Sequence, residues 1–309
     1  MDPIAFINIK KDSSFAMLLE AQRRGWSLFY MQQKDLFMTE QQSFAQVQAL
    51  TVEDNKQGWF QLEQAQEIKL ADLDVILMRK DPPFDMEYIY TTYLLEVAEK
   101  QGTLIINKPQ SIRDCNEKLF TLAFPQCCPP LLVTREQSRL LDFIKQHQDC
   151  ILKPLDGMGG ASIFRVQDKD PNNRVIIETL TQYQTKTIMA QRYIAEIKAG
   201  DKRILMVNGK PIPYALARIP SAQDHRGNLA AGGKGRGQPL TKRDYWIAEQ
   251  VGAELKRRGL FFVGLDVIGD YLTEINVTSP TCIRELDQQF NLNISGVLFD
   301  SIEKHLDLN

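Results

Sequence analysis

The 309-residue sequence lacks several features that would point to particular classes of protein. Its five cysteines form no CxxC pair and its three histidines lie far apart, so neither a disulfide framework, a zinc site nor a catalytic triad is indicated. The formal net charge of −2 gives no electrostatic signature of binding to nucleic acid or an anionic membrane. No apolar run approaches the roughly 20 residues that span a bilayer. An odd number of scattered thiols is typical of a reducing compartment, and we expect a cytoplasmic protein.

What the sequence does contain is ordinary globular composition, 43% hydrophobic and 25% charged, with enough length for two or three subdomains. Residues 1–115 alternate strand-like and helix-like segments, which predicts a mostly parallel, open α/β sheet. The expected strands are 4–9, 26–31, 47–52, 74–78 and 103–106, and the expected helices are 15–24 and 86–101, the first capped at Asp12-Ser13-Ser14.

The remaining chain favours two further domains, at residues 116–192 and 193–309. The first is a small α+β unit, with expected helices at 114–124 and 136–146 and expected strands at 150–154, 163–166 and 187–194. The second has expected strands at 203–207 and 211–219, a helix at 243–258, a hairpin at 261–277 and a final helix at 294–306.

The hairpin is the most informative stretch. Asp266 interrupts an apolar run, and Glu274 and Asn276 lie two residues apart, on one face of the next strand. A three-residue loop would place Asp266 opposite Glu274, whereas a two-residue loop would not. Oxygen ligands without histidine or thiolate suit Mg²⁺, with Mn²⁺ as an alternative. An acidic hairpin that faces solvent is the other interpretation.

Two glycine-rich segments are candidates for binding anions. Lys153 ends a strand before the turn Gly157–Ser162, where glycine backbone N–H groups can approach phosphate, although a plain hairpin is the commoner meaning of such a turn. The segment 220–239 carries Arg226, Lys234 and Arg236, which suits either a mobile lid over an anionic substrate or a floppy insertion. A third candidate is Arg79, which follows a strand end and could bind a carboxylate or simply be solvated.

Longer motifs carry a resemblance to a known family. They are NKPQSIRDCNEKLF, ILKPLDGMGGASIFRV, ARIP followed by RGNLAAGGKGRG, and LTEINVTSPTCIRE. Together they resemble the bacterial glutathione synthetases of the ATP-grasp superfamily, over essentially the whole chain. Members of that family begin with an apolar strand ahead of the segment matching Met1–Ile4. We therefore expect either a truncated start or an N-terminal sheet that lacks a strand.

The resemblance implies ATP-dependent joining of γ-glutamylcysteine and glycine through an acyl phosphate, in a homo-oligomer (a dimer or tetramer) that binds small molecules, not nucleic acid or membranes. A glutamate-adding ligase of the same superfamily and a non-catalytic nucleotide-binding regulator remain as alternatives. The implied catalytic residues are Arg203 and Arg218, and the implied metal ligands are Asp266, Glu274 and Asn276. The implied ATP-binding residues are Lys118, Lys153, Gly157, Gly159, Gly160, Ala161, Ser162, Gln191, Arg192, Tyr193, Ile194 and Asp201. The implied peptide-substrate residues are Arg79, Asn228, Gly232, Gly233 and Arg284, with a structural ion pair of Arg284 to Glu285 or Asp287 as the other interpretation.

Overall fold

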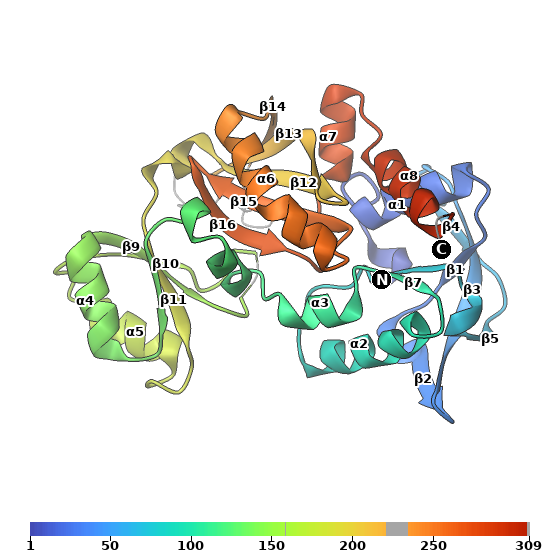
Figure 1. Cartoon of the computed structure of the whole chain (residues 1–309), viewed down its shortest axis with the longest axis horizontal. Helices are drawn as coiled ribbons and strands as arrows, with labels where there is room; N and C mark the ends of the chain where they lie inside the picture. Colours follow the sequence, from blue (N-terminus) through green and yellow to red (C-terminus); the bar gives the residue numbers. More distant parts are fainter. Residues whose placement is uncertain (158, 221–233, 308–309) are drawn as a thin grey trace.

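The computed structural model describes residues 1–157, 159–220 and 234–307. Three groups of elements follow one another along the longest axis of the molecule (Figure 1). The small domain is at one end, a five-stranded sheet lies in the middle, and the N-terminal elements are at the other end.

The N-terminal strands form a different sheet from the one expected. Strand β3 (Gln42–Val52) pairs antiparallel with its four partners, and parallel pairing is confined to β6 (Val75–Leu77) and β7 (Leu104–Ile106). The partners are β1 (Leu28–Tyr30), β2 (Leu36–Thr39), β4 (Phe60–Leu62) and β5 (Gln66–Lys69). The prediction of a mostly parallel sheet is therefore wrong here. The tight β2–β3 turn places Glu40 and Gln41 at positive φ without the Gly or Asn that usually marks such a turn.

The two N-terminal sheets do not join. Strands β1 and β6 flank a cavity of about 160 Å³, which helices α1 (Ser13–Arg23) and α2 (Met86–Glu99) also line. The amino group of Met1 donates a hydrogen bond to the carbonyl of Met31, which also lines this cavity. The segment expected as a first strand instead contains the short 3₁₀ helix η1 (Ile4–Phe6).

The N-terminal helices begin where their caps predict. Asp12 accepts a hydrogen bond from the Phe15 N–H at the start of α1 (Ser13–Arg23), and Asp85 caps α2 (Met86–Glu99) in the same way. The helix expected over 114–124 is wrong, because α3 (Pro109–Asp114) ends there. The Asn116 side chain then accepts hydrogen bonds from two backbone N–H groups and turns the chain into η4 (Leu119–Ala123).

The small domain is a four-stranded antiparallel sheet in the order β10-β9-β11-β8. Its strands are β8 (Leu131–Thr134), β9 (Asp149–Pro154), β10 (Phe164–Gln167) and β11 (Ile188–Arg192). Helices α4 (Gln137–His147) and α5 (Asn173–Thr181) pack on it through one apolar cluster. Strand β8 and helix α5 were not expected from the sequence. The other elements lie within two residues of their predicted positions.

The central sheet has the order β14-β13-β12-β15-β16 and is antiparallel throughout. Its strands are β12 (Asp201–Val207), β13 (Lys210–Ile219), β14 (Lys234–Pro239), β15 (Phe262–Ile268) and β16 (Tyr271–Asn276). The short 3₁₀ helix η6 (Ala195–Ala199) precedes β12. Residues 234–239, expected as part of a mobile loop, are thus a strand paired with β13. Residues 221–233 lie outside the described part of the chain.

Helices cover the apolar parts of the central sheet. Helix α6 (Lys242–Arg257) packs on it through one cluster, while α7 (Ile283–Phe290) and α8 (Ile294–Leu306) belong to a second cluster that also includes α1. The C-terminal helices therefore join the central sheet to the N-terminal elements, as Figure 1 shows. Within the described residues, no helix is long and apolar enough to cross a membrane.

Candidate active site

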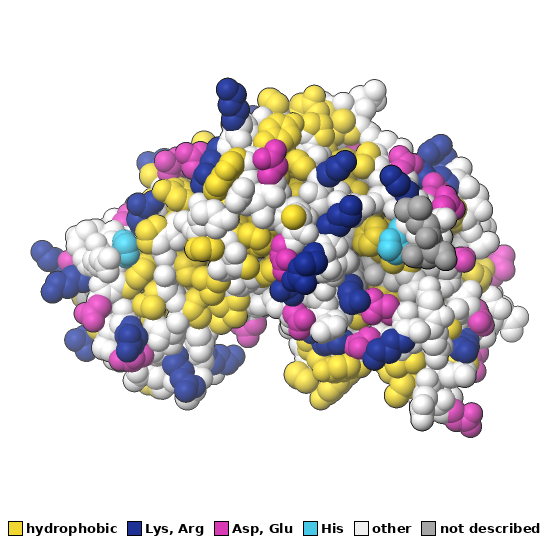
Figure 2. Space-filling model, viewed as in Figure 1, with side chains coloured by type: hydrophobic (Ala, Val, Ile, Leu, Met, Phe, Trp, Pro, Cys, Tyr) yellow, Lys and Arg dark blue, Asp and Glu magenta, His cyan; other side chains and the backbone are white. Residues whose placement is uncertain are grey.

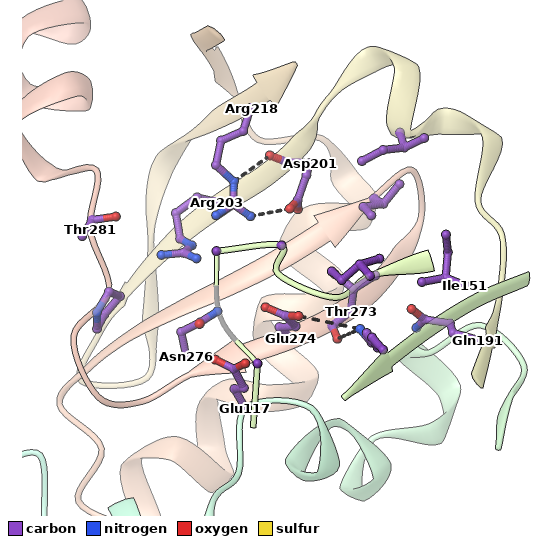
Figure 3. Close-up of a pocket in the computed structure, with 18 of the residues that line it drawn as sticks. Glu117, Ile151, Gln191, Asp201, Arg203, Arg218, Thr273, Glu274, Asn276 and Thr281 are labelled. Atoms are coloured by element: carbon purple, nitrogen blue, oxygen red, sulfur yellow. Dashed lines mark hydrogen bonds and ion pairs between the residues drawn. The ribbon is translucent and has the colours of Figure 1, made fainter. Parts of the chain in front are cut away.

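A cavity of about 380 Å³ lies where the small domain meets the central sheet. Figure 3 shows Asp201, Arg203 and Arg218 on one side of it and Glu117, Glu274 and Asn276 on the other. Gln191 and Ile151 lie at one end and Thr281 at the opposite end. Thirteen of the residues implied by the resemblance line this cavity: Lys153, Gly157, Gly159, Gly160, Gln191, Arg192, Tyr193, Ile194, Asp201, Arg203, Arg218, Glu274 and Asn276.

The hairpin brings Asp266 directly opposite Glu274, as predicted, but by a different route. The turn consists of two residues, Gly269 and Asp270, because Ile268 pairs with Tyr271. A β-bulge then inserts Thr273 as an extra residue and shifts the register by one. The Thr273 hydroxyl donates to the Asp266 carbonyl at 3.0 Å and helps to hold the bulge. The prediction of a three-residue turn is therefore wrong, while the pairing that it was meant to explain is present.

One side of the cavity, here called the arginine side, consists of Asp201, Arg203, Arg218 and Asp266. Register places Arg203 opposite Asp266, and Arg218 opposite Asp201, on adjacent strands. Arg203 binds Asp266 with two hydrogen bonds of 2.5 and 3.0 Å, and Arg218 approaches the same carboxylate at 2.8 Å. Burial alone would raise the pKa of Asp266, but the two guanidinium groups hold it well below its ordinary value.

Asp201 has one carboxylate oxygen paired and one without a partner. Its Oδ2 accepts a hydrogen bond from Arg218, whereas its Oδ1 is buried with no hydrogen-bond partner. Burial raises the pKa of Asp201 to about 7, and nearby Asp266 adds to this effect while Arg218 opposes it. A buried acceptor that lines a cavity is satisfied when a ligand donates to it, and a sugar hydroxyl is a donor of that kind.

The opposite side, here called the lysine side, consists of Glu117, Lys118, Lys153 and Glu274. Its contacts with Glu274 are long: the Lys118 and Lys153 ammonium groups lie 3.8 and 3.7 Å from Glu274 Oε1. Lys118 also contacts Glu117 and donates to the Gly157 carbonyl at 2.7 Å. Burial and the neighbouring Glu274 raise the pKa of Glu117 to about 7. Lys118 itself is almost fully buried and is not among the residues that line the cavity.

Two of the three backbone N–H groups of residues 192–194, which link the two domains, are already bound within the protein. The N–H of Arg192 donates to the Pro130 carbonyl and that of Tyr193 to the Asp149 carbonyl. Only the Ile194 N–H in this segment lacks a partner among the described residues. Four isoleucines add an apolar lining to this part of the cavity: Ile151, Ile163, Ile197 and Ile268. An apolar slot with one free N–H suits a flat heterocycle.

The glycine turn borders the cavity. Gly159 and Gly160 have φ values of 63° and 82°, which glycine adopts without strain. Ala161 and Ser162, implied as ATP-binding residues, do not line the cavity. Met158, within the same turn, lies outside the described residues.

Two of the implied peptide-substrate arginines are located elsewhere. Arg79 is buried, not exposed, and donates to Ser14 Oγ at 3.1 Å and to the Pro280 carbonyl at 2.8 Å. Arg284 pairs with Asp54 at 2.7 Å, so its ion pair is structural but involves neither Glu285 nor Asp287. Neither arginine lines the cavity. The remaining predicted substrate residues, Asn228, Gly232 and Gly233, lie outside the described part of the chain.

Sequence reasoning missed several residues that line the cavity, above all Asp81, Glu117 and the segment Thr278–Cys282. Glu117 is adjacent to Lys118, and that adjacency is the signal that could have identified it. Asp81 follows Arg79 in the same loop, but nothing in the sequence distinguishes it from a solvated loop acid. Cys282 is a packed thiol, because it is buried and burial raises its pKa.

Of the three predicted metal ligands, two offer oxygen atoms that suit a hard divalent cation. No group of three His, Cys, Asp or Glu side chains in the described ranges is arranged to hold a metal ion. The carboxylate of Asp266 is already bound by Arg203 and Arg218. The amide nitrogen of Asn276 donates to Asp266, which leaves its amide oxygen, together with Glu274, for a cation in the cavity.

Lys153, Arg203 and Arg218 line a cavity between two domains, beside an acidic hairpin. This arrangement is that of an ATP-grasp ligase, and comparisons with known proteins agree. The family model for the prokaryotic glutathione synthetase ATP-grasp domain matches residues 117–291, and the model for the N-terminal domain of the same family matches residues 1–113. The chain belongs to the prokaryotic glutathione synthetase family, and it is therefore an ATP-dependent ligase of glutathione synthesis.

Curated relatives match at high identity. The chain is 63% identical over 306 residues to the glutathione synthetase of Pseudomonas syringae pv. tomato, covering 99% of this chain and 96% of that protein. It is 61% identical to the glutathione synthetase of Escherichia coli K12, covering 99% of this chain and 97% of that protein.

Solved structures support the fold alone, because their sequence identity is low. The ATP-grasp ligase PsnB in complex with precursor peptide PsnA2 and AMPPNP aligns with a TM-score of 0.62 at 17% identity, covering 99% of this chain and 96% of that one. D-cycloserine synthetase DcsG aligns with a TM-score of 0.60 at 13% identity, covering 76% and 86%. The predicted ATP-grasp fold is confirmed.

Proposed function

We propose that the cavity joins the cysteinyl carboxylate of γ-glutamylcysteine to the amine of glycine, with hydrolysis of ATP to ADP and phosphate. The carboxylate oxygen attacks the γ-phosphorus and ADP departs. The glycine amine then attacks the acyl carbon of the resulting acyl phosphate, inorganic phosphate leaves, and the amine loses a proton. The observation that carries this proposal is the convergence of Lys153, Arg203 and Arg218 on one cavity, with the Lys118 ammonium 3.8 Å from Glu274, which also lines it. Such chemistry needs charge neutralisation and positioning, not a protein nucleophile.

The geometry supports a distinct role for each part of the cavity. The apolar slot with the free Ile194 N–H suits adenine, and the unpaired Asp201 Oδ1 suits a ribose hydroxyl. Lys118 and Lys153 suit the phosphate chain, with Gly157, Gly159 and Gly160 beside it. Arg203 and Arg218 are held rigidly by Asp266 and suit the transferring phosphoryl group and the acyl-phosphate oxygens.

We further propose that Glu274 and Asn276 hold Mg²⁺ or Mn²⁺, with Asp266 acting through the two arginines. The ion would neutralise charge on the ATP phosphates. Glu274 is suited to this role because its two ammonium neighbours lie at the long distances of 3.7 and 3.8 Å. This departs from the sequence expectation of three equivalent ligands, since Asp266 is almost fully buried beneath the arginines.

An assay of ADP release over a panel of dipeptides and amines tests the proposed function. We expect release to require both γ-glutamylcysteine and glycine together with a divalent cation. Equal release without either substrate would contradict the proposal. Use of glutamate as the acceptor would indicate the glutamate-adding alternative, and ATP binding without any product would indicate a regulator.

We also propose a cytoplasmic homo-oligomer. One face of α2 supports an interface, because Met86, Tyr90 and Tyr93 lie at helical spacing and are each more than half exposed. Sedimentation of wild type and of Tyr90→Glu tests the interface, and an unchanged mass in the variant would contradict it.

On the face shown in Figure 2, basic and acidic side chains are interspersed, which supports the expectation of no nucleic-acid partner.

A further inference from the structure

The end of the cavity opposite Gln191 carries a carboxylate that the proposed chemistry does not use. It is lined by Asp81 and Pro82 from the loop after β6 and by Thr278–Cys282 from the loop after β16. The Thr278 hydroxyl donates a hydrogen bond to Asp81 Oδ2, which fixes the carboxylate at the edge of the cavity. Figure 3 places Thr281, from the same loop, far from Gln191 and Ile151.

The cations nearest to Asp81 in sequence bind other groups. The Arg79 guanidinium donates to Ser14 and to the Pro280 carbonyl, and the Lys80 ammonium pairs with Asp2 at 2.6 Å. No ion pair in the described part of the chain involves Asp81, although many other acidic groups of the cavity have one. Asp81 is only partly exposed, and burial raises its pKa against the opposing hydrogen bond from Thr278. A partly desolvated carboxylate of this kind gains from a cationic ligand.

We propose that Asp81 binds the ammonium group of an amino-acid substrate. Gln191 and Ile151 lie at one end of the cavity, and Thr281 lies at the opposite end, in the loop whose Thr278 binds Asp81. Lys153, Arg203 and Arg218 also line the cavity. ATP carries no cationic group, so a carboxylate beyond the phosphate-binding cations serves the other substrates. A charged hydrogen bond to an ammonium also excludes substrates that lack one. This inference rests on the proposed function, because it takes its substrates from that reaction.

Two substrates of the reaction carry such a group. One is the α-ammonium of the γ-glutamyl residue, and the other is the ammonium of glycine before it loses a proton. Both present the same chemistry to Asp81, and separate kinetic measurements distinguish them.

The test compares Asp81→Asn with wild type in the ADP-release assay, varying ATP, γ-glutamylcysteine and glycine in turn. Asparagine keeps the size of the side chain and the acceptor for Thr278. Loss of a hydrogen bond to a charged group predicts a rise of about tenfold or more in KM for one amino substrate. We expect the KM for ATP to stay within about twofold. Asp300→Asn, which removes an exposed carboxylate on α8, is the matched control.

Analogues without the amine identify the source. If Asp81 binds the dipeptide, wild type discriminates against glutarylcysteine and Asp81→Asn loses much of that discrimination. If it binds glycine, wild type binds glycine better than its competitor glycolate, and Asp81→Asn loses that preference. Unchanged KM values for both amino substrates, or the same shifts in Asp300→Asn, would overturn the inference. If Asp81→Asn does not fold, the wild-type enzyme still provides a test. The inference is overturned if wild type prefers neither γ-glutamylcysteine over glutarylcysteine nor glycine over glycolate. Absence of ligation by wild type would instead reject the proposed function.

Discussion

Asp266 and Glu274 face one another across a single hairpin, yet the protein binds them in opposite ways. Asp266 is 2% exposed and has contacts of 2.5 to 3.0 Å with Arg203 and Arg218. Glu274 is 20% exposed and has ammonium neighbours no closer than 3.7 Å. The Asp266 carboxylate is therefore fully bound by the protein's own arginines, whereas the Glu274 carboxylate remains able to bind a ligand.

Within one site, the arginine side is therefore rigid and the lysine side is available for ligand binding. The arginine side is assembled by cross-strand register and is complete without any ligand. On the lysine side, burial and then the neighbouring Glu274 raise the pKa of Glu117. Such a region gains stability when a ligand compensates the repulsion. We therefore infer that mutations on the arginine side damage folding and activity together, whereas mutations on the lysine side damage activity alone.

The largest effect is expected for Asp266→Asn. It leaves two adjacent buried guanidinium groups with Asp201, on Arg218, as their remaining carboxylate partner. Removing one partner of a buried ion pair costs about 3–5 kcal/mol. We expect a fall of that size in the free energy of unfolding, measured by urea denaturation, and turnover close to background. The amide of asparagine has nearly the same volume, so the loss reports charge and not packing.

The control for this change is Glu254→Gln, which breaks a surface ion pair with Arg257 and Arg258 on α6. Exposed pairs contribute roughly 0–1 kcal/mol, so this variant should resemble wild type. An unfolding free energy for Asp266→Asn within about 1 kcal/mol of wild type would show that the arginines do not depend on Asp266.

Glu274→Gln should separate activity from stability. We expect kcat to fall about 10²–10³-fold, because the substitution removes a carboxylate that helps to neutralise the phosphates. The free energy of unfolding should change by less than about 1 kcal/mol, since the contacts that are lost are long. Turnover as a function of Mg²⁺ concentration and urea denaturation of the same preparation are the two measurements. Loss of stability equal to that of Asp266→Asn would remove the contrast between the two carboxylates.

Glu117→Gln should show a smaller effect that depends on pH. The folded-state pKa of Glu117 is raised to about 7 from an ordinary 4.5, so the folded state binds a proton that the unfolded state has released. Wild-type stability should therefore fall as pH rises from about 4.5 through 7, while the variant lacks this contribution. Between pH 5 and pH 8, we expect the free energy of unfolding of the variant to rise by about 1–3 kcal/mol relative to that of wild type. Urea denaturation at pH 5 and pH 8 measures this. If the difference in unfolding free energy between the variant and wild type is the same at both pH values, the raised pKa of Glu117 is contradicted.

Much of this site could be predicted from the sequence, and the failures have physical causes. Asp266 was identifiable because it interrupts an apolar strand, and Lys153 because it precedes a glycine turn. The antiparallel N-terminal sheet was not, since its tight β2–β3 turn uses Glu40 and Gln41 at positive φ. Asp81 was not identifiable either, because only the fold brings it to Thr278, 197 residues away.

The last prediction concerns the bulge that aligns the two carboxylates. A two-residue turn without a bulge would place Thr273 opposite Asp266 and turn Glu274 to the other face of the sheet. Thr273→Val removes the 3.0 Å hydrogen bond to the Asp266 carbonyl but keeps the branched shape. We expect a loss of about 1 kcal/mol in stability and a several-fold rise in the Mg²⁺ concentration needed for half-maximal turnover. Thr103→Val, which removes a 3.0 Å hydrogen bond to the Leu70 carbonyl and does not line the cavity, controls for a general effect of the substitution. If both variants shift the Mg²⁺ requirement equally, the alignment of Asp266 with Glu274 does not depend on this hydrogen bond, and the bulge is held by the turn and strand packing alone.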